Sequence, residues 1–462
     1  MAATSWAYHE FGHARLGDAR RTKRLVALAM QRVSQPQGSI AQSCGGRAAS
    51  KAAYRFYGNE AIAPQEIQAS HQQRLRERLR AEQWVLAVQD TTQLDYSRHP
   101  ATRGLGYLQD LQHQGLLVHT TLAVTARRVP LGVIAQQVWA RAEGEYGKRH
   151  RRRQRPTGDK ESQKWVHSLQ ATHDLEVTLP GTHLVSVGDS EADVYDLLRE
   201  ALRLEQALLV RACRDRRVEH EEQYLWAHLE SQAPAGTLQV SIPAHPGRAA
   251  RTARVTVRYA EVVLRPPRWR RQEKLPLLPV WAVLVREETP PAEAEAVEWL
   301  LLTIVAVTTF AQACERILWY TCRWVVEMYH RVLKSGCRLE ERQFDHAATI
   351  QRYLALDAIV AWRVLYLTMI GRAQSQLPCE ALLEAREWQA LYCFIHHTSV
   401  PPAEPPTLGQ VTRWIAQLGG FLGRRSDGEP GSQVIWQGLQ RLHDIALAWQ
   451  IFHPDLPAAG CG

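Results

Sequence analysis

Residues 84–90, Trp-Val-Leu-Ala-Val-Gln-Asp, and residues 183–189, His-Leu-Val-Ser-Val-Gly-Asp, are two short apolar runs that each end in a carboxylate. Runs of this length and composition are typical of buried β-strands. If the two strands are neighbours in one sheet, the side chains of Asp90 and Asp189 lie side by side. The sequence therefore predicts a sheet that presents two carboxylates at the ends of adjacent strands.

Further strands and helices are expected around this pair. Apolar runs predict strands at 117–124, 131–139 and 207–213, and helices are expected from about Lys160 and over 191–203. The resulting order, β-β-β-α-β-α-β, permits Asp90 and Asp189 to pair in a ribonuclease H-like sheet. We therefore expect an α/β fold in which a ribonuclease H-like mixed sheet forms the core of residues 81–372.

The segments outside this pattern predict the remaining organisation. Residues 1–80 have few strand-forming residues and predict a helical domain, and residues 373–462 predict a helical C-terminal region. Between about 216 and 305, alternating runs separated by Pro-containing turns predict a β-rich insertion in the core domain. A long helix is expected from Ala311 to about Leu333, and residues 401–406 are expected to form a linker.

Positive charge is concentrated at the N-terminus. Residues 1–80 hold thirteen Lys and Arg against five Asp and Glu, while the whole chain has a formal net charge of +9. A second basic run, residues 146–156, contains six Lys and Arg and predicts an exposed loop. Such asymmetry favours a polyanionic partner, in particular nucleic acid, although a merely solvated basic face produces the same pattern.

Several features bear on the compartment. No apolar run approaches the roughly 18–20 residues of a membrane span, and residues 1–10 do not have the pattern of a secretory signal. The eight cysteines include no CxxC pair and no zinc-type spacing. We therefore expect free thiols and a cytoplasmic location.

A third carboxylate is predicted on the long helix. Tyr320, Arg323, Glu327 and Lys334 are spaced at +0, +3, +7 and +14, which places them within an arc of roughly 60° on a regular helix. Mg²⁺ prefers carboxylate ligands, and two such ions can promote cleavage of a phosphodiester bond. Asp90, Asp189 and Glu327 are therefore the predicted catalytic and metal-binding residues, with cations beside them to hold phosphates.

Each of these residues also has a structural interpretation. An aspartate at a strand end often caps the following turn, and Arg323 with Glu327 could be an ordinary i,i+4 ion pair. Glu340 and Glu341 are alternative third carboxylates. Asp193, one turn after the second aspartate, has the position of a residue in the first turn of a helix rather than of a ligand. Only the joint occurrence of two strand-end aspartates and a polar helix face favours a catalytic site.

The pattern Tyr320-x2-Arg323-x3-Glu327-x6-Lys334 resembles the signature of the insertion-sequence-four family of DDE transposases. Ordered blocks along the rest of the chain extend the resemblance, and these are residues 16–25, 53–59, 90–92, 159–165, 189–193, 298–303 and 418–421. The resemblance implies a cut-and-paste transposase with a head that binds transposon ends, a ribonuclease H-like catalytic domain and a C-terminal dimerisation region. It also implies Mg²⁺, with Mn²⁺ as a possible substitute, a hairpin intermediate, and a homodimer on double-stranded DNA in the bacterial nucleoid.

The resemblance further implies which residues contact DNA. Trp299 is expected to hold a base flipped out of the bent hairpin, with Trp324 assisting it. The other expected DNA contacts are Tyr320, Arg323, Lys334, Arg20, Arg21, Lys23, Arg24, Arg55, Arg211 and Lys164. Two positions depart from the family pattern, because Ser190 replaces an Arg and Met328 replaces an acidic residue. Neither departure removes a predicted metal ligand.

Two other functions are compatible with parts of the sequence. A non-catalytic DNA-binding regulator of transposition needs only the basic head and the dimerisation region, and has no use for the carboxylates. A ribonuclease H-like repair or junction nuclease would share the metals but should lack the helix that carries Tyr320, Arg323, Glu327 and Lys334. The combined pattern favours the transposase.

Overall fold

A ten-stranded mixed sheet runs through the computed structural model, which describes residues 5–147, 160–221, 224–242, 250–292, 294–424 and 427–453. The strands follow the order β2-β3-β1-β5-β6-β10-β9-β8-β7, and β4 also pairs with β3. Their bounds are β1 Trp84–Asp95, β2 Gly106–Tyr107, β3 Gln114–Thr125, β4 Pro130–Trp139, β5 His183–Gly188, β6 Leu208–Arg211, β7 Gly236–Ile242, β8 Arg251–Leu264, β9 Leu278–Arg286 and β10 Glu298–Thr303.

The predicted neighbours β1 and β5 are adjacent. They pair in parallel over Trp84–Val88 and His183–Val187, while β3 pairs with β1 in antiparallel orientation on its other side. β6 extends the parallel part beyond β5. The four predicted strands that flank or follow β1 are all present, with shifted ends. The two-residue strand β2 was not predicted.

The prediction that the first strand ends at Asp90 is wrong. β1 continues to Asp95, because its antiparallel ladder with β3 extends through the pair Asp90–Thr120 to the pair Asp95–Gly115. The parallel ladder with β5 stops earlier, at Val88. At Asp90, β1 still pairs with β3 but no longer pairs with β5. The β5 side of Asp90 is therefore not occupied by a paired strand.

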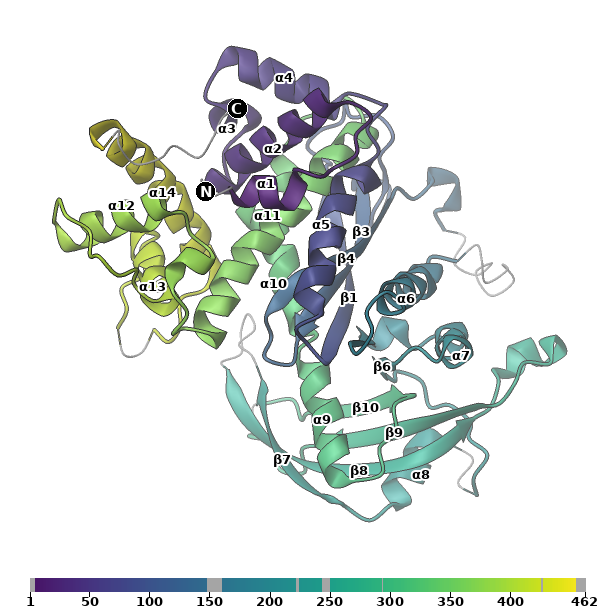
Figure 1. Ribbon diagram of the computed structural model, residues 1–462. Coiled ribbons are helices and arrows are strands. Elements are labelled where there is room, and N and C mark those ends of the chain that lie inside the picture. The colour runs from purple at the N-terminus through teal and green to yellow at the C-terminus, as the bar shows by residue number, and fades with distance from the viewer. Residues whose placement is uncertain are drawn as a thin grey trace.

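The β-rich segment belongs to the same sheet. β10 pairs in antiparallel orientation with β6, and β9, β8 and β7 follow in succession, so the main sheet continues into the insertion. The helix α8 Leu225–Ser231 precedes these strands in the chain. In Figure 1 these strands form the lower part of the molecule, beneath β1 and β6.

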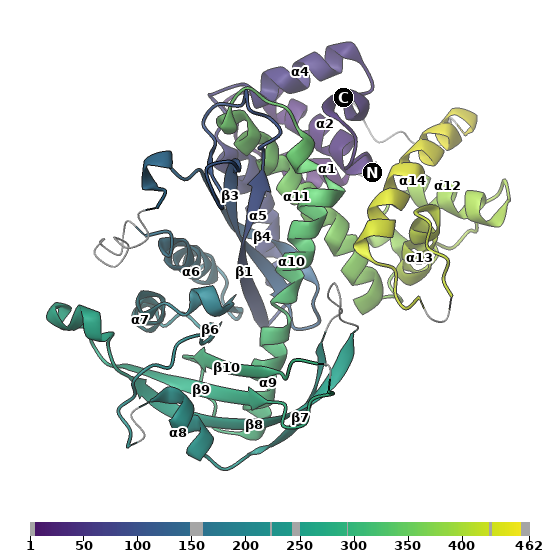
Figure 2. The ribbon, with the colours of Figure 1, turned by 180° about the vertical axis from the view of Figure 1, so that it is seen from behind.

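Helices cover the central strands on both sides (Figures 1 and 2). On one side, α6 Gln163–Glu176 and α7 Tyr195–Leu204 pack through apolar residues such as Trp165 and Leu198. On the other side, α10 Trp324–Arg331 packs Val326 and Tyr329 against the residues of β1 and β5 that alternate toward it.

The prediction of one regular helix from Ala311 to about Leu333 is also wrong. The segment is divided into α9 Phe310–Thr321, α10, and a π-helical turn, η6 Val332–Gly336. Cys322 and Arg323 keep right-handed helical dihedral angles, so the axis is interrupted rather than reversed. The signature residues therefore do not share the single face of a regular helix, and Lys334 lies in the π-helical turn.

Residues 6–79 are helical, as predicted for the N-terminal segment. The helices are α1 Trp6–Phe11, α2 Ala19–Ser34, α3 Ile40–Cys44, α4 Arg47–Tyr57 and α5 Pro64–Leu79. Ser39 forms a capping box with Gln42 and begins the short helix α3, which was not predicted. α5 packs against β4 and thereby joins this helical head to the sheet.

A long apolar helix, α11 Ala347–Ala373, joins the three parts of the chain. It contacts α5 and α2 of the head, β4 of the sheet, and α13 Leu408–Leu418 and α14 Ser432–Phe452 near the C-terminus. Its length and composition would suit a membrane span, but 94% of its most apolar window is buried inside the protein. It therefore has the surroundings of a core helix.

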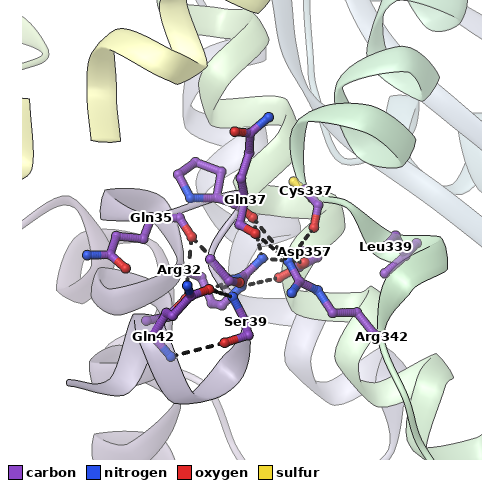
Figure 3. Close-up of polar contacts among 12 residues, drawn as sticks. Arg32, Gln35, Gln37, Ser39, Gln42, Cys337, Leu339, Arg342 and Asp357 are labelled. Carbon is purple, nitrogen blue, oxygen red and sulfur yellow. Dashed lines mark hydrogen bonds and ion pairs between the residues drawn. The ribbon is translucent and has the colours of Figure 1, made fainter. Parts of the chain in front are cut away.

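Arg32 on α2 binds Asp357 on α11 at the junction of the head with this helix (Figure 3). Both side chains are buried, with relative exposures of 2% and 0%. Arg32 also donates to the carbonyl oxygens of Pro36 (2.6 Å) and Gly38 (2.7 Å). Arg342 donates to the carbonyl oxygen of Cys337 (2.7 Å) beside this network. The turn after α2 is thus held to the core by guanidinium groups.

The C-terminal region is helical, as expected. α12 Ala385–His396 packs with α13 and α14 beside the head (Figure 1). Residues 401–406, the expected linker, contain no helix or strand. Most of the predicted basic loop, residues 148–156, lies outside the described residues.

Candidate functional site

The candidate site begins where the pairing of β1 with β5 ends. Val88 pairs with Val187, and Asp90 and Asp189 each follow two residues later. Because side chains alternate along a strand, both aspartates continue the series that faces α10. Asp189 is the N-cap of the short helix η4 Ser190–Ala192, and its Oδ1 accepts a hydrogen bond from the backbone N–H of Glu191 (2.8 Å). The structure thus brings the two predicted aspartates to one place.

α10 presents Glu327 and Arg323 toward this pair. An Nη2 of Arg323 donates to Oε1 of Glu327 at 2.6 Å, and both side chains are largely buried. His330 follows one turn later, and its Nδ1 lies 3.8 Å from Oδ2 of Asp90. Burial lowers the pKa of His330 to about 3, so the ring is neutral and this contact is not an ion pair.

The charges of all three predicted carboxylates meet at Asp90. Burial raises the pKa of Asp90 to about 6, and the negative charges of Asp189 and Glu327 contribute to that rise. A hydrogen bond from the backbone of Thr91 and the guanidinium of Arg323 act in the opposite direction. A carboxyl group whose pKa is raised by burial and by two neighbouring carboxylates lies in a site where a bound cation would be stabilised.

The donor set fits a divalent cation, although the carboxylates do not form a closed cage. Within the described residues, no group of three or more His, Cys, Asp or Glu side chains converges closely enough to hold a metal ion. The contacts above explain this, because Glu327 is held by Arg323 and Asp189 caps a helix. Oxygen donors alone, with a neutral histidine behind them, are the chemistry that Mg²⁺ or Mn²⁺ requires.

Aromatic and basic residues border the carboxylates on the β10 side. Trp299 on β10 is partly buried, and its ring lies 5.3 Å from that of Tyr320 in an edge-on arrangement. Burial raises the pKa of the Tyr320 phenol, while the nearby charges of Arg323 and Arg211 lower it. Arg211 also donates to the carbonyl oxygen of Glu298 (3.2 Å). Trp299, Tyr320, Arg323 and Arg211 therefore form one wall, as a contact to DNA would need.

Other predicted DNA contacts lie in different surroundings. Trp324 is partly buried at the start of α10. Lys334 pairs with Glu340 at 3.1 Å, and Lys164 pairs with Glu191 at 3.3 Å, two residues after Asp189. Both lysines are thus paired with acidic neighbours, and the pair of Lys164 with Glu191 lies two residues from Asp189.

The predicted basic residues of the head lie on α2 and α4, away from the carboxylates. Arg20, Lys23 and Arg55 are exposed, and Arg21 and Arg24 are partly exposed. Arg20 pairs with Asp18 at 2.9 Å, and Arg21 donates to the carbonyl oxygen of Leu16 (3.0 Å). The structure therefore separates a basic helical surface from the carboxylate site.

The alternative carboxylates have structural partners. Asp193 is buried and binds Arg216, and it accepts hydrogen bonds from the backbone N–H groups of Cys213 and Arg214. Glu341 pairs with Arg338. Glu340 accepts a hydrogen bond from the backbone N–H of Asp95 (2.8 Å) in addition to its pairing with Lys334. None of these three groups is needed to explain the site.

Two histidines beside the site were not predicted. His330 lies three residues after Glu327, a spacing that could have suggested a shared helix face. His119 on β3 is buried, and its Nδ1 forms a 2.9 Å hydrogen bond with the hydroxyl of Thr91. Because that contact crosses between two strands, no local pattern in the sequence points to it.

A cavity of about 730 Å³ lies elsewhere, between the head and the C-terminal helices. Trp6 and Glu10 from α1, Trp362 from α11 and Glu387 from α12 line it. It contains none of the predicted catalytic residues. The candidate site therefore lies where the pairing of β1 with β5 ends, and not in this cavity.

Two family models match the chain on either side of the carboxylates. Residues 3–62 match a family described as transposase DNA-binding. Residues 359–448 match a family described as the transposase Tn5 dimerisation domain. The first match covers α1 to α4, and the second begins within α11 and covers α12 to α14. The site residues on β1, β5 and α10 lie between the two matched regions.

Proposed function

We propose that this chain, which is a Tn5-like transposase with the DNA-binding and dimerisation domains of that group, is the catalytically active enzyme. It cuts transposon ends out of double-stranded DNA and joins them to a target. One observation carries this proposal: the carboxylate of Asp90 lies in the field of Asp189 and Glu327, beside the guanidinium of Arg323.

The strand arrangement supports a ribonuclease H-like core for this activity. Three antiparallel strands, β4, β3 and β1, are followed in the sheet by the parallel strands β5 and β6. Asp90 lies on β1, and Asp189 directly follows β5. α10 packs on the face of the sheet toward which both aspartates are directed. We infer domain limits of 1–80, 81–372 and 373–462, with the β-rich insertion at about 216–305.

The roles of the acidic residues follow from their chemistry. Asp90, Asp189 and Glu327 would hold Mg²⁺ or Mn²⁺, which activates the attacking oxygen and stabilises the leaving oxygen of a phosphodiester. Arg323 orients Glu327 through their hydrogen bond. Arg211 and Lys334 supply positive charge for the phosphates on either side of the scissile bond.

The reaction proposed here proceeds by successive displacements at phosphorus. Water first attacks a phosphodiester of one strand and leaves a free 3′-hydroxyl on the transposon end. That hydroxyl attacks the phosphodiester of the opposite strand and expels the 3′-oxygen of the flanking DNA, which forms a hairpin on the transposon end. Water reopens the hairpin, and the released 3′-hydroxyl attacks target DNA. The sharp bend of the hairpin forces a base out of the stack, and Trp299, in contact with Tyr320, offers an aromatic face to that base. Trp324 assists it.

The proposal can be tested by incubating the purified protein with Mg²⁺ and with DNA duplexes taken from the sequence that flanks its gene. Hairpin-ended products on a denaturing gel are expected, and Glu327→Gln should abolish them while end binding persists. Glu315→Gln is the matched control, because Glu315 is a half-exposed glutamate on α9 that pairs with the neighbouring Arg316. Binding to the ends without cleavage by the wild-type protein would contradict the proposal and favour a non-catalytic regulator.

A further inference from the structure

An exposed basic turn lies between β8 and β9, outside both matched families. The turn is η5 Arg268–Glu273, and Lys274 follows it with a left-handed backbone conformation. Arg268, Trp269, Arg271 and Lys274 are all exposed, and the Trp269 side chain has a relative exposure of 53%. In Figure 1 the turn projects at the end of the β8–β9 hairpin, beyond α7.

The turn is anchored rigidly despite its exposure. Arg270 is buried, with an Nη1 that donates to both carboxylate oxygens of Asp196 (2.9 and 2.7 Å). Its Nε and Nη2 donate to the carboxylate of Glu273 (2.8 and 2.6 Å). Arg270 therefore links Glu273 of the turn to Asp196 of α7, and the charges of both carboxylates are neutralised by this buried guanidinium. The neighbouring cations remain directed to solvent.

The exposed cations have no acidic partner among the described residues. No ion pair within 4.0 Å involves Arg268, Arg271 or Lys274 in that part of the chain. Lys160 adds a fourth cation, because its Nζ lies 5.2 Å from the centre of the Trp269 ring. A large exposed indole that holds a lysine beside three further cations is a surface for a polyanion.

The surface is linked to the carboxylate site through α7 and through the segment that precedes α6. Asp196 lies in the first turn of α7, which follows Asp189 and η4 in the chain. Lys160 precedes Lys164 by four residues, so the two are separated by at most about 14 Å. Lys164 in turn binds Glu191 beside Asp189. The basic turn is therefore connected to the site by contacts on both sides.

We propose that Arg268, Arg271, Lys274 and Lys160, the last of which lies against the Trp269 ring, form a second DNA-binding surface, which contacts the phosphates of duplex DNA that runs past the cleavage site. This inference rests on the proposed function, because it places the DNA at the carboxylate edge. This surface is not expected to recognise a particular base sequence, since its exposed groups provide only positive charge and an aromatic ring. Its duplex is flanking or target DNA, distinct from the end sequence bound by the head.

Binding of a random-sequence duplex in EDTA tests the surface without any cleavage. The triple variant Arg268→Ala, Arg271→Ala, Lys274→Ala should bind at least about ten-fold more weakly at 50 mM salt. The slope of log K against log salt should also become less steep by about 2.7, since each of the three lost phosphate contacts removes about 0.9. The triple variant Arg254→Ala, Arg413→Ala, Arg424→Ala is the matched control, because it removes three exposed charges elsewhere.

Charge-conserving replacement separates binding from folding. Arg268→Lys, Arg271→Lys, Lys274→Arg should restore the wild-type salt slope. An unchanged slope in the alanine variant, or an equal loss in the control variant, would overturn the inference. Because no metal is present, this result is independent of whether Glu327→Gln abolishes cleavage. The two proposals can therefore fail separately.

Discussion

The guanidinium of Arg32 and the carboxylate of Asp357, which are 325 residues apart in the chain, form a buried bidentate pair with two 3.0 Å hydrogen bonds. The remaining N–H groups of Arg32 bind the carbonyl oxygens of Pro36 and Gly38 and the hydroxyl of Ser43. Five donors in a planar fork are thus all satisfied, and only arginine supplies them. The pair fixes the end of α2, whose first turns carry basic head residues, relative to α11.

We predict that Arg32→Lys destabilises the protein by about 1–3 kcal/mol, because lysine keeps the charge but leaves buried acceptors of the guanidinium without a donor. The double variant Arg32→Met, Asp357→Leu should remain destabilised, because the carbonyl oxygens of Pro36 and Gly38 still lose their donor. Urea unfolding measures both effects. Arg413→Lys is the control, since its pair with Glu429 is exposed. A double variant as stable as the wild type would show that the pair is dispensable.

The sequence predicted the central strands but not their extent. Residues 89–93, Gln-Asp-Thr-Thr-Gln, interrupt the apolar run, so the hydrophobic pattern alone ends the predicted strand at Asp90. Pairing with β3 extends β1 to Asp95 because backbone hydrogen bonds across the ladder outweigh the weak local preference. The break between α9 and α10 was missed for a related reason: no Pro or Gly marks it, and tertiary packing determines where the axis changes.

The site was predictable where its residues obey local spacing. Asp90 and Asp189 follow equivalent apolar runs, and Arg323 and Glu327 are one helical turn apart and form the expected hydrogen bond. His119 could not be predicted, because its contact to Thr91 depends on strand register. Arg270 and Asp196 likewise meet only through the fold.

Acid should weaken the junction between the head and the sheet. His71 on α5 hydrogen-bonds through Nδ1 to the carboxylate of Glu10, and its Nε2 accepts the backbone N–H of Val133 (2.8 Å). The ring must therefore be neutral, and burial lowers the pKa of His71 below 6.5. Burial alone would raise the pKa of Glu10, but interactions with His71 and Arg78 outweigh it and lower the pKa to about 2.

Both pKa shifts make the free energy of unfolding decrease as the pH is lowered. The contribution of neutral His71 is complete above its unfolded pKa of about 6.5 and is lost at lower pH, and that of Glu10 is lost from about 4.5 toward 2. We expect the urea concentration at the unfolding midpoint to decrease when the pH is lowered from 7 to 5. The variant His71→Gln should show a smaller decrease. His113→Gln is the control, since the pKa of exposed His113 is raised by its hydrogen bond to Asp110. Equal flattening in both variants would refute the assignment.

Asp90 should lower the stability of the metal-free protein. Its pKa rises from 3.8 to about 6 through burial first and the nearby carboxylates second, so stability is lost as pH rises through this range. In EDTA at neutral pH, Asp90→Asn should therefore stabilise the fold by up to about 3 kcal/mol while it abolishes cleavage. Asp95→Asn on the same strand should give no gain, because hydrogen bonds with Ser97 help to lower the pKa of Asp95. Thermal unfolding compares the two variants, and a destabilised Asp90→Asn protein would contradict the prediction.

Arg323 should affect cleavage more than end binding. Lysine at this position keeps the charge but loses the planar fork that holds Glu327 at 2.6 Å, so the carboxylate gains rotational freedom. Loss of a group that orients a metal ligand typically reduces activity by about 10- to 100-fold. We therefore expect Arg323→Lys to slow hairpin formation by that factor, to raise the Mn²⁺ concentration required for half-maximal rate, and to leave end binding unchanged. Arg331→Lys, an exposed substitution on the same helix, should be neutral in both measurements. If Arg323→Lys instead weakened end binding and left the Mn²⁺ requirement unchanged, Arg323 would act on DNA and not on Glu327.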